Sequence, residues 1–439
     1  MNTTVPSALN QRQVFSAWWP LAASWLLMGT EMSLVSAAIA RFPDAAFHLA
    51  AFGGLVFPVA LLIEAPIIMM LAASTALSTD RRAFRTLKKF STTCGLALSA
   101  LHALIAFTPL YDIVLVGLID PPEGAIEPGR IWMQWMTLWT WAIADRRFHQ
   151  GLLIRFERSR TVVIGTLVRL CVMVGILAVG MAHGEVPGIA VACCALSSGV
   201  VAEMIATRVF AKPIITGPLA SAPLGQPLTL RRLLSFYVPL AITPILNLMA
   251  LPIGSASISR MAMPLENHAA WPPVNGLIFM ARSVGIAFNE VVVSLSDRPG
   301  AHRALNGFAV KLTIATSAIL TLIAFTPLST LWFDVVSGLE PDILSVAKDA
   351  LPLGVLLPGL TVLISLYTGR LVSVRKTRAI PESVGLCLLV TVSGLFLGVT
   401  LNEHPGVQVA LTAFTLGVIA QILWLRFRQE EAEPIHSES

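Results

Sequence analysis

Long apolar runs follow one another along the chain, separated by short polar segments. Twelve such runs are present, at 14–39, 46–77, 91–118, 131–154, 161–182, 187–210, 232–258, 270–295, 305–329, 345–369, 381–402 and 405–426. Each is long enough to cross a bilayer as an α-helix, which satisfies all of its own backbone hydrogen bonds in lipid. The pattern therefore predicts an all-α integral membrane protein with twelve transmembrane helices.

The composition supports this class and excludes others. Of 439 residues, 55% are hydrophobic and only 13% are charged, whereas a soluble chain carries about 25% charged residues. Soluble, secreted, fibrous and disordered classes are thereby excluded. The net charge of +5 follows from the positive-inside bias of membrane proteins, so we expect no nucleic-acid partner.

One segment divides the chain into two sets of six runs. The stretch 211–231, AKPIITGPLASAPLGQPLTLR, is rich in proline, glycine and small residues, which is typical of a linker. We therefore expect a first six-helix lobe at 1–210, a cytoplasmic linker at 211–231, a second lobe at 232–426 and a cytoplasmic tail at 427–439.

Basic residues between the runs set the orientation. With a cytoplasmic N-terminus, 20 lysines and arginines fall on the inner side, and the outer side holds only four, Arg41, Arg130, Arg260 and Lys348. This asymmetry predicts that both termini are cytoplasmic. We expect a multi-pass protein of the inner (plasma) membrane, with the lipid bilayer as its constant partner.

The two sets of runs repeat each other at a nearly constant offset. ALIAFTPL at 103–110 recurs as TLIAFTPL at 321–328, and GLLIRFERSR at 151–160 matches GRLVSVRKTR at 369–378 at the same offset. SAAIAR at 36–41 recurs as SASISR at 255–260, at almost that offset. Because six helices per repeat is an even number, both halves have the same orientation. The symmetry axis then lies along the membrane normal, and a central cavity between the halves is the expected substrate site.

Several of these motifs carry a family resemblance. They are LLSFYVPLA at 233–241, LYTGRLVSVRKTR at 366–378, its copy RRFHQGLLIRFERSR at 146–160, and the small-residue end of span one before Arg41. In them the chain resembles the progressive ankylosis protein family and its bacterial relatives, within the multidrug/oligosaccharidyl-lipid/polysaccharide (MOP) exporter superfamily. The resemblance implies two MATE-like six-helix bundles. It also implies export of small anions such as pyrophosphate, nucleotides or citrate, as in animal members, of drugs in exchange for protons or sodium, or of lipid-linked sugars.

A second fold with parallel six-helix halves competes with this one. The major facilitator fold places a turn rich in Asp and Arg after spans two and eight. STDRRAFR at 78–85 and LSDRPGAHR at 295–303 follow those spans here, although the glycine-led part of that pattern is incomplete. A major-facilitator-type transporter is therefore the alternative fold.

Ionisable residues inside the predicted spans are the candidate functional residues. Each costs at least about 2.5–3.5 kcal/mol at mid-bilayer, so each needs a partner, water or a function. The candidates for substrate binding, ion binding or gating are Glu31, Glu64, Arg146, Arg147, Arg169, Glu203, Arg282 and Glu290. Glu31 and Glu64 are also the candidate carriers of a coupling proton.

Two pairs stand out among these candidates. Glu64 and Arg282 are separated by the same offset as ALIAFTPL and TLIAFTPL, and so occupy equivalent positions in the two halves. They could face each other across the cavity as a gate or exchange pair, or each could find a local hydroxyl or backbone partner. Arg169 and Glu203 lie at similar depth in spans five and six, where we expect a structural ion pair.

Span four is unusual at both of its ends. At the inner end, Arg146 and Arg147 could draw in an anionic substrate, or could extend to lipid headgroups. At the outer end a group of tryptophans predicts an interfacial belt, with a stacking surface as the alternative; these are Trp132, Trp135, Trp139 and Trp141.

The chain lacks the sequence signatures of hydrolytic or metal chemistry. It has no phosphate-binding glycine loop, no metal-ligand spacing and no nucleophile elbow, so we expect neither an enzyme nor a cofactor. The sequence predicts a secondary active exporter of a small or amphiphilic, anionic solute, coupled to protons, sodium or the substrate gradient. The alternatives are a flippase for a lipid-linked precursor and a membrane scaffold that transports nothing. We expect a monomer.

Overall fold

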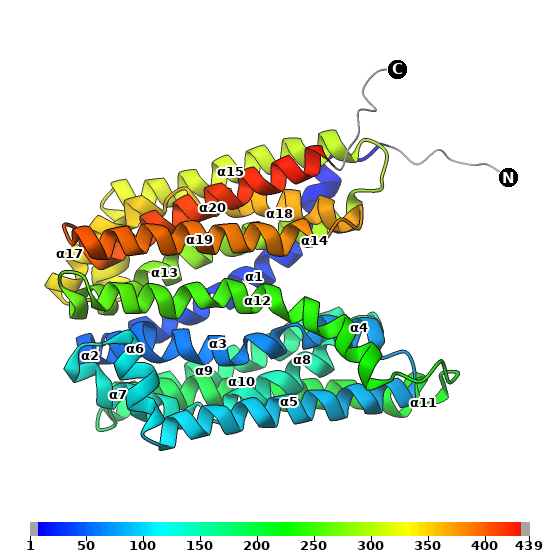
Figure 1. Ribbon diagram of the computed structural model, residues 1–439, viewed down its shortest axis with the longest axis horizontal. Helices are drawn as coiled ribbons and strands as arrows, with labels where there is room; N and C mark the ends of the chain where they lie inside the picture. The colour runs from blue at the N-terminus through cyan, green and yellow to red at the C-terminus, as the bar shows by residue number, and fades with distance from the viewer. Residues whose placement is uncertain (1–7, 432–439) are drawn as a thin grey trace. The chain divides into compact units, whose positions relative to one another are not determined.

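The computed structural model describes residues 8–431, and its regular elements are helices (Figure 1). Eleven helices of the described part are long and apolar enough to cross a membrane. The remaining predicted span, 131–154, is formed by α7 (Glu123–Trp135) and α8 (Trp139–Arg155), two helices of 13 and 17 residues that are each too short to be counted among the eleven. The chain is thus an all-α, multi-pass membrane protein, as predicted.

The first repeat contains the helices α1 to α11. Besides α7 and α8 these are α1 (Gln11–Ile39), α2 (Ala45–Leu49), η1 (Ala50–Val56), α3 (Phe57–Ile68), α4 (Met70–Leu77), α5 (Arg81–Phe107), η2 (Asp112–Val116), α6 (Gly117–Ile119), α9 (Ser159–His183), α10 (Gly188–Thr216) and α11 (Pro218–Ser221).

The second repeat contains the helices α12 to α20. These are α12 (Leu230–Ser259), α13 (Pro264–Ile286), α14 (Phe288–Leu295), α15 (Ala301–Phe325), α16 (Leu328–Thr330), η3 (Leu331–Val336), α17 (Pro341–Ala350), η4 (Leu351–Gly354), α18 (Leu357–Ser373), α19 (Ala379–Leu401) and α20 (Gly406–Glu430).

The predicted internal repeat is confirmed by the helix ends. Helices α8 and α18 begin and end at equivalent positions of the repeat. Helices α5 and α15 also end at equivalent positions, at Phe107 and Phe325. Thr108 and Thr326 each bond back to the carbonyl four residues earlier, at 2.6 Å in both cases. Each precedes a proline, which disfavours a further helical residue before it. The same local chemistry therefore stops both helices at the same place in the repeat.

The chain forms two compact units that do not follow the repeat boundary. The first unit is Ala38–Arg260, and the second is Met261–Ser439 together with Met1–Ala37. Helix α12, which opens the second repeat, therefore belongs to the first unit, and α1 belongs to the second. The lobes expected at 1–210 and 232–426 describe the sequence repeat, whereas the compact units exchange its leading helices.

Matching aromatic anchors hold the two exchanged helices. In the first unit, Tyr237 of α12 donates to the carbonyl of Pro66 at 2.5 Å and packs edge-on against Phe90 at 5.2 Å. In the second unit, Trp18 of α1 donates to the carbonyl of Val284 at 2.9 Å and packs edge-on against Phe308 at 5.5 Å. All three positions are repeat-related, so both leading helices use one anchoring geometry.

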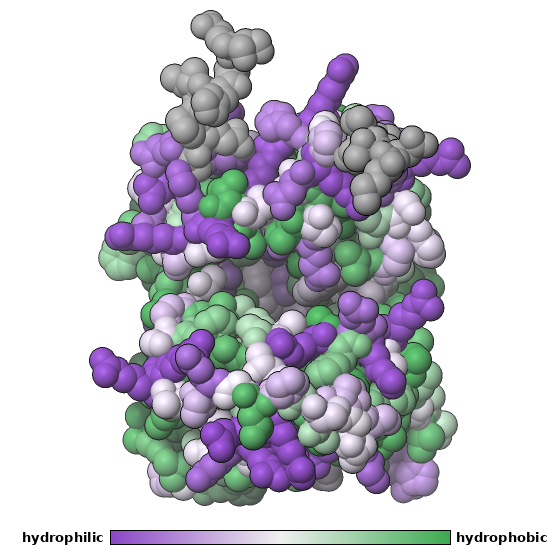
Figure 2. Space-filling view, turned by 90° about the vertical axis from the view of Figure 1, so that its right-hand side faces the viewer, coloured by the Kyte–Doolittle hydropathy of each residue, from purple (hydrophilic) through white to green (hydrophobic). Residues whose placement is uncertain are grey.

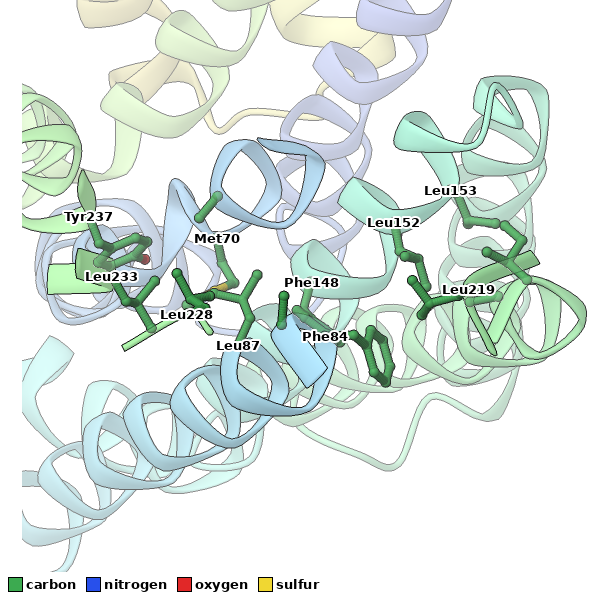
Figure 3. Close-up of a cluster of buried hydrophobic side chains, with 14 of the residues drawn as sticks. Met70, Phe84, Leu87, Phe148, Leu152, Leu153, Leu219, Leu228, Leu233 and Tyr237 are labelled. Atoms are coloured by element: carbon green, nitrogen blue, oxygen red, sulfur yellow. The ribbon is translucent and has the colours of Figure 1, made fainter. Parts of the chain in front are cut away.

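A hydrophobic cluster in the first unit fixes the inner half of α8. Phe148 and Leu152 of α8 pack there with Met70, Leu87 and Leu233 from neighbouring helices (Figure 3). Beside this cluster α8 passes very close to α4, because a Cβ on Gly151 would lie 2.3 Å from the backbone oxygen of Leu71. Only glycine permits that approach, and it brings the polar residues of α8 into the interior of the unit.

Helix α5 starts well before the predicted run at 91–118. Its cap is Asp80, whose Oδ1 accepts from the backbone N–H groups of Arg82 and Ala83 at 2.8 and 3.1 Å. The N–H of Ala83, with those of Arg82 and Gly225 and the Thr79 hydroxyl, holds the pKa of Asp80 below its usual value. The basic residues expected in a loop therefore lie on the first turns of a capped helix.

The predicted linker is partly helical, which corrects its expected start. Helix α10 continues through Pro213 to Thr216, and α11 follows directly. Apolar side chains of this stretch, including Ile214 and Leu219, pack into the cluster of Figure 3, and that burial outweighs the local preference for a loop. The N–H of Gly225 then donates to Asp80 at 3.3 Å, which ties the linker to the start of α5.

Hydrophilic side chains gather over the end of the first unit at which α5 begins. Arg81, Arg82 and Arg85 are exposed there, and Figure 2, which faces this end, shows many hydrophilic side chains among hydrophobic ones. The exposed sides of α5 and α9 farther along include apolar residues such as Leu96 and Val174. This division suits helices with ends in water and sides in lipid.

Candidate functional site

Helix α8 runs through the interior of the first unit and carries a row of polar residues. It packs against α3, α4, α5, α9 and α10, so it has neighbouring helices on several sides. Asp145, Arg146, His149 and Gln150 are each no more than 5% exposed. A span that faces protein rather than lipid tolerates such residues.

Glu203 of α10 is the centre of the buried charges. Its carboxylate accepts from Arg146, from Gln150 Nε2 at 3.0 Å and from Thr166 Oγ1 at 3.3 Å. Arg169 of α9 places its Nε 3.5 Å from the same carboxylate. The ion pair predicted between Arg169 and Glu203 is therefore present. The sequence did not identify Gln150 and Thr166, because uncharged residues give no signal in an apolar run.

A second ion pair joins α8 to α10 one turn away. Arg208 binds Asp145 with two nitrogens, at 2.6 and 2.9 Å, and its guanidinium lies 5.2 Å from the ring centroid of Trp141. His149 Nδ1 lies 3.1 Å from the Asp145 carboxylate. Arg208 was not a candidate from sequence, although its place inside a predicted span was a usable signal. These contacts clamp α8 to α10.

Two further charged side chains of this region form no hydrogen bond or ion pair with the described residues. Glu64 of α3 is 5% exposed, and its buried Oε2 has no hydrogen-bond partner among the described residues. Arg147 of α8 is half-buried, and its buried Nε likewise has none. The charges that act on Glu64 are those of Arg146 and Arg147. Arg147 in turn is acted on by the charges of Arg146, Glu203, Glu64 and Arg169. Glu64 and Arg147 thus interact through space without a direct bond.

We call these five residues the α8 cluster: Glu64, Arg146, Arg147, Arg169 and Glu203. It contains three guanidinium groups and two carboxyl groups. Glu203 engages two of the guanidiniums, and the third, on Arg147, has no ion-pair partner in the described part of the chain. The cluster therefore has an excess of positive charge inside a membrane-spanning unit.

Arg282 of α13 lies in the second unit and has local partners. Its Nε donates to the hydroxyl of Thr361 at 2.9 Å, and its guanidinium lies 5.2 Å from the ring centroid of Phe414. This hydroxyl contact is of the kind that the local-partner alternative describes. The facing pair of Glu64 and Arg282 stays a prediction.

The other two candidates also lie in the second unit, outside the α8 cluster. Glu31 is on α1 and is half-buried. Glu290 is on α14, where the side chain of Trp25 interacts with it. Their predicted roles in binding or gating stay predictions.

The tryptophan belt expected at the outer end of span four is wrong in part. Trp132 is fully buried and Trp139 is 6% exposed, whereas Trp135 is 54% exposed. Trp132 lies 4.6 Å from Phe52, and Trp139 lies 6.0 Å from Phe57, measured between ring centroids. The chain turns between α7 and α8, and Trp132 and Trp139 are buried in the interior. A belt role stays a prediction for the exposed Trp135.

An open cleft of about 570 Å³ lies at the end of α8. Its lining residues are Thr75, Thr79, Ile154, Arg155, Phe156 and Ala222. Arg155 donates to the carbonyls of Thr75 and Ala76 at 2.8 and 3.2 Å and so caps the end of α4. No group of His, Cys, Asp and Glu suited to a metal ion is present in the described residues. The five cysteines are free.

Comparison with known proteins identifies the fold. Neither a protein-family model nor a curated protein matches the chain. Among solved structures, the chain is similar to an inward-facing multidrug resistance MATE family transporter of the MOP superfamily. That match has 15% identity, a TM-score of 0.76, and coverage of 98% of this chain and 100% of the other.

Two further solved structures agree with this match. One is the lipid II flippase MurJ, at 13% identity and a TM-score of 0.68, with 94% of this chain and 87% of the other covered. The other is a MOP superfamily transporter from Pyrococcus furiosus whose binding pocket is described as having reverse polarity. It has 15% identity, a TM-score of 0.61 and 97% coverage of both chains. The chain therefore has the fold of MOP superfamily transporters over nearly its whole length.

Proposed function

We propose that this protein is a secondary active transporter that exports a small anionic solute by alternating access. The fold supports the general activity, because similar solved structures along the whole chain are transporters. Secondary coupling is favoured because the sequence lacks a nucleotide-binding loop.

The single observation that carries the anionic substrate is the charge of the α8 cluster. A buried charge without a partner is costly, yet the cluster keeps Arg147 unpaired among the described residues. An anion that enters the first unit would supply the missing negative charge. A substrate with a positive charge would be repelled by the same excess.

The finer assignments belong to this proposal. They are membership of the progressive ankylosis family, residence in the inner membrane with both termini cytoplasmic, a monomeric state and coupling to protons or sodium. Glu64 and Glu31 are the carboxyl groups that we propose for a proton. The sequence motifs at 146–160 and 366–378 support the family, and the basic residues between the spans support the orientation.

A flippase for a lipid-linked precursor is the second candidate function. The similarity to the lipid II flippase supports it, and the phosphate of a lipid headgroup would suit the same positive cluster. The major-facilitator alternative is set aside, because the structural matches belong to the MOP superfamily.

The proposal is tested by comparing metabolites in the medium of cells that express the protein with those of cells that lack it. We expect at least one anionic metabolite to accumulate outside only in expressing cells. An Arg147→Ala variant at equal abundance should abolish the difference. Equal media from both strains, with reconstituted vesicles inactive towards anions and lipid-linked precursors, would contradict transport and favour the scaffold.

A further inference from the structure

Glu64 and Arg147 leave two complementary functional groups unused inside the same unit. They come from neighbouring helices, α3 and α8, which pack against each other. Glu64 Oε2 is buried without a hydrogen bond, and so is Arg147 Nε, within the described part of the chain. Each is acted on by the charge of the other, yet they do not form an ion pair. A ligand between them could bond to both.

The other two guanidiniums of the cluster already have a carboxylate partner. Arg146 and Arg169 are engaged by Glu203, which is itself 1% exposed. Arg147 is the one arginine of the cluster that is half-buried, whereas Arg146 and Arg169 are buried. It has five N–H donors in a planar fork, a geometry that matches the oxygens of phosphate or carboxylate. The chemistry of the ligand is therefore an oxyanion.

We propose that Arg147 and Glu64 form a binding site for an oxyanion of the phosphate type, bound together with one proton. This inference rests on the proposed function and names its substrate class. Arg147 donates to two oxygens of the anion, and the proton lies between a third oxygen and Glu64 Oε2. Inorganic phosphate brings that proton itself, as an O–H group, and a phosphate monoester brings one only below its second pKa of about 6. Sulfate does not, so a proton from the solvent must accompany it.

The surroundings of Glu64 restrict which groups can supply or hold this proton. The charged groups that act on Glu64 are Arg146 and Arg147, both on α8. Helices α5 and α12 also pack against α3, and the titratable group that α12 brings close is Tyr237, whose hydroxyl is already donated to Pro66. Glu64 is the one carboxyl group beside Arg147 that has an unused oxygen.

The experiment is a titration of purified full-length protein in detergent with inorganic sulfate and inorganic phosphate at several pH values. At pH values at which Glu64 is ionised, we expect wild-type protein to take up one proton from the solvent per sulfate bound. Once Glu64 is ionised, the affinity for sulfate should then fall about tenfold for each pH unit. Glu64→Gln carries a permanent N–H donor, so its sulfate affinity should be independent of pH. Sulfate binding with the same pH dependence in both proteins would overturn the role of Glu64.

The role of Arg147 is tested by two substitutions and a control. Arg147→Ala should lower the affinity for both anions at least about tenfold, and Arg147→Lys should lower it less, because lysine keeps the charge but loses the planar fork. Arg85→Gln removes one exposed positive charge of the same unit and should leave both affinities unchanged. Size-exclusion chromatography checks folding; equal affinities in folded Arg147→Ala, Arg147→Lys and wild type would overturn the site.

Competition with a short-chain phosphatidic acid distinguishes the two sources of a phosphate group. Displacement of sulfate by inorganic phosphate at millimolar concentration supports a free solute. Displacement by the lipid alone supports a headgroup, and displacement by neither overturns the proposed ligand. Binding as expected without transport would contradict the proposed function but keep the site. Transport that is unaffected by Arg147→Ala would contradict the site but keep the proposed function.

Discussion

The two repeats build the same three helices with different interiors. Helices α8, α9 and α10 of the first repeat correspond to α18, α19 and α20 of the second, in the same order along the chain. At the equivalent positions of the second repeat, the charged residues Arg146, Arg147, Arg169 and Glu203 are replaced by Ile364, Ser365, Cys387 and Gln421. The four charges that α8, α9 and α10 contribute to the α8 cluster are therefore confined to one repeat.

This difference separates what the fold needs from what the site needs. In the second repeat, Gln421 approaches Ser383 with its amide at 3.5 Å, and helix packing continues without any ion pair at these positions. Neutral residues thus suffice to assemble the helices. Because burying charges costs free energy that packing does not require, the α8 cluster is better explained by function than by stability.

The comparison is tested most strongly at Glu203. Glu203→Gln copies the second repeat but leaves the guanidiniums of Arg146 and Arg169 without their carboxylate. We expect the free energy of unfolding to fall by about 3–5 kcal/mol, measured by thermal unfolding in detergent. Making Arg146→Ile and Arg169→Cys as well should recover most of this loss and abolish transport. A triple variant that transports at the wild-type rate would show that these charges have no functional role.

The close approach at Gly151 sharpens the comparison between α8 and α18. A Cβ there would lie 2.3 Å from a backbone oxygen, whereas on Gly369 of α18 it would lie 2.7 Å from the side chain of Val292. Backbone yields less readily than a side chain, so Gly151→Ala should lose about 1–3 kcal/mol of stability. Gly369→Ala should lose less. The reverse order in thermal unfolding would show that α8 does not pack more rigidly than α18.

The cap at Asp80 has no counterpart in the second repeat, where α15 begins after Gly300 without a side-chain cap. Asp80→Ala should lower stability by about 0.5–2 kcal/mol, and Asp297→Ala much less. The folded pKa of Asp80 lies below its unfolded value. Its stabilisation is therefore complete above the unfolded value of about 3.9 and is lost as the pH falls through the folded value. Unfolding curves of wild type and Asp80→Ala should converge at acidic pH, and parallel curves would contradict this.

The smallest effect is expected at the two aromatic anchors. Tyr237→Phe and Trp18→Phe each remove one donor to a backbone carbonyl while keeping an aromatic ring. Each should cost about 0.5–1.5 kcal/mol, and the two losses should be similar because the anchors share one geometry. A loss confined to one variant would mean that the anchors are equivalent in shape but not in energy.

The sequence predicts the helices and the repeat because both depend on local patterns. Apolar runs predict spans, and equal spacing of ALIAFTPL and TLIAFTPL predicts equal helix ends at Phe107 and Phe325. The start of α5 at Arg81 was missed because a cap at Asp80 depends on hydrogen bonds rather than on hydropathy. The helical start of the linker was missed because it depends on burial of Ile214.

The site is predictable only in part for a related reason. A charge in an apolar run is visible in the sequence, so Arg169 and Glu203 could be paired in advance. Which additional charge reaches Glu203 depends on the rotation of α8, and Arg146 rather than Arg147 does so. The neighbouring side chain is thereby left without an ion pair. A rotation of this kind is set by packing at Gly151 and Phe148, and no single residue pattern encodes it.

The exchange of leading helices sets an order for biosynthesis. Trp18 of α1 donates to the carbonyl of Val284, which lies in the second repeat. Val284 is synthesised much later, because it follows Trp18 by 266 residues along the chain. At a translation rate of about 5–20 residues per second, α1 spends roughly 13–53 s in the membrane before its anchor is synthesised. Every helix of the first unit, by contrast, has emerged once α12 is complete at Ser259. The second unit is therefore the later to mature, and the ribosome delivers its first helix long before its last.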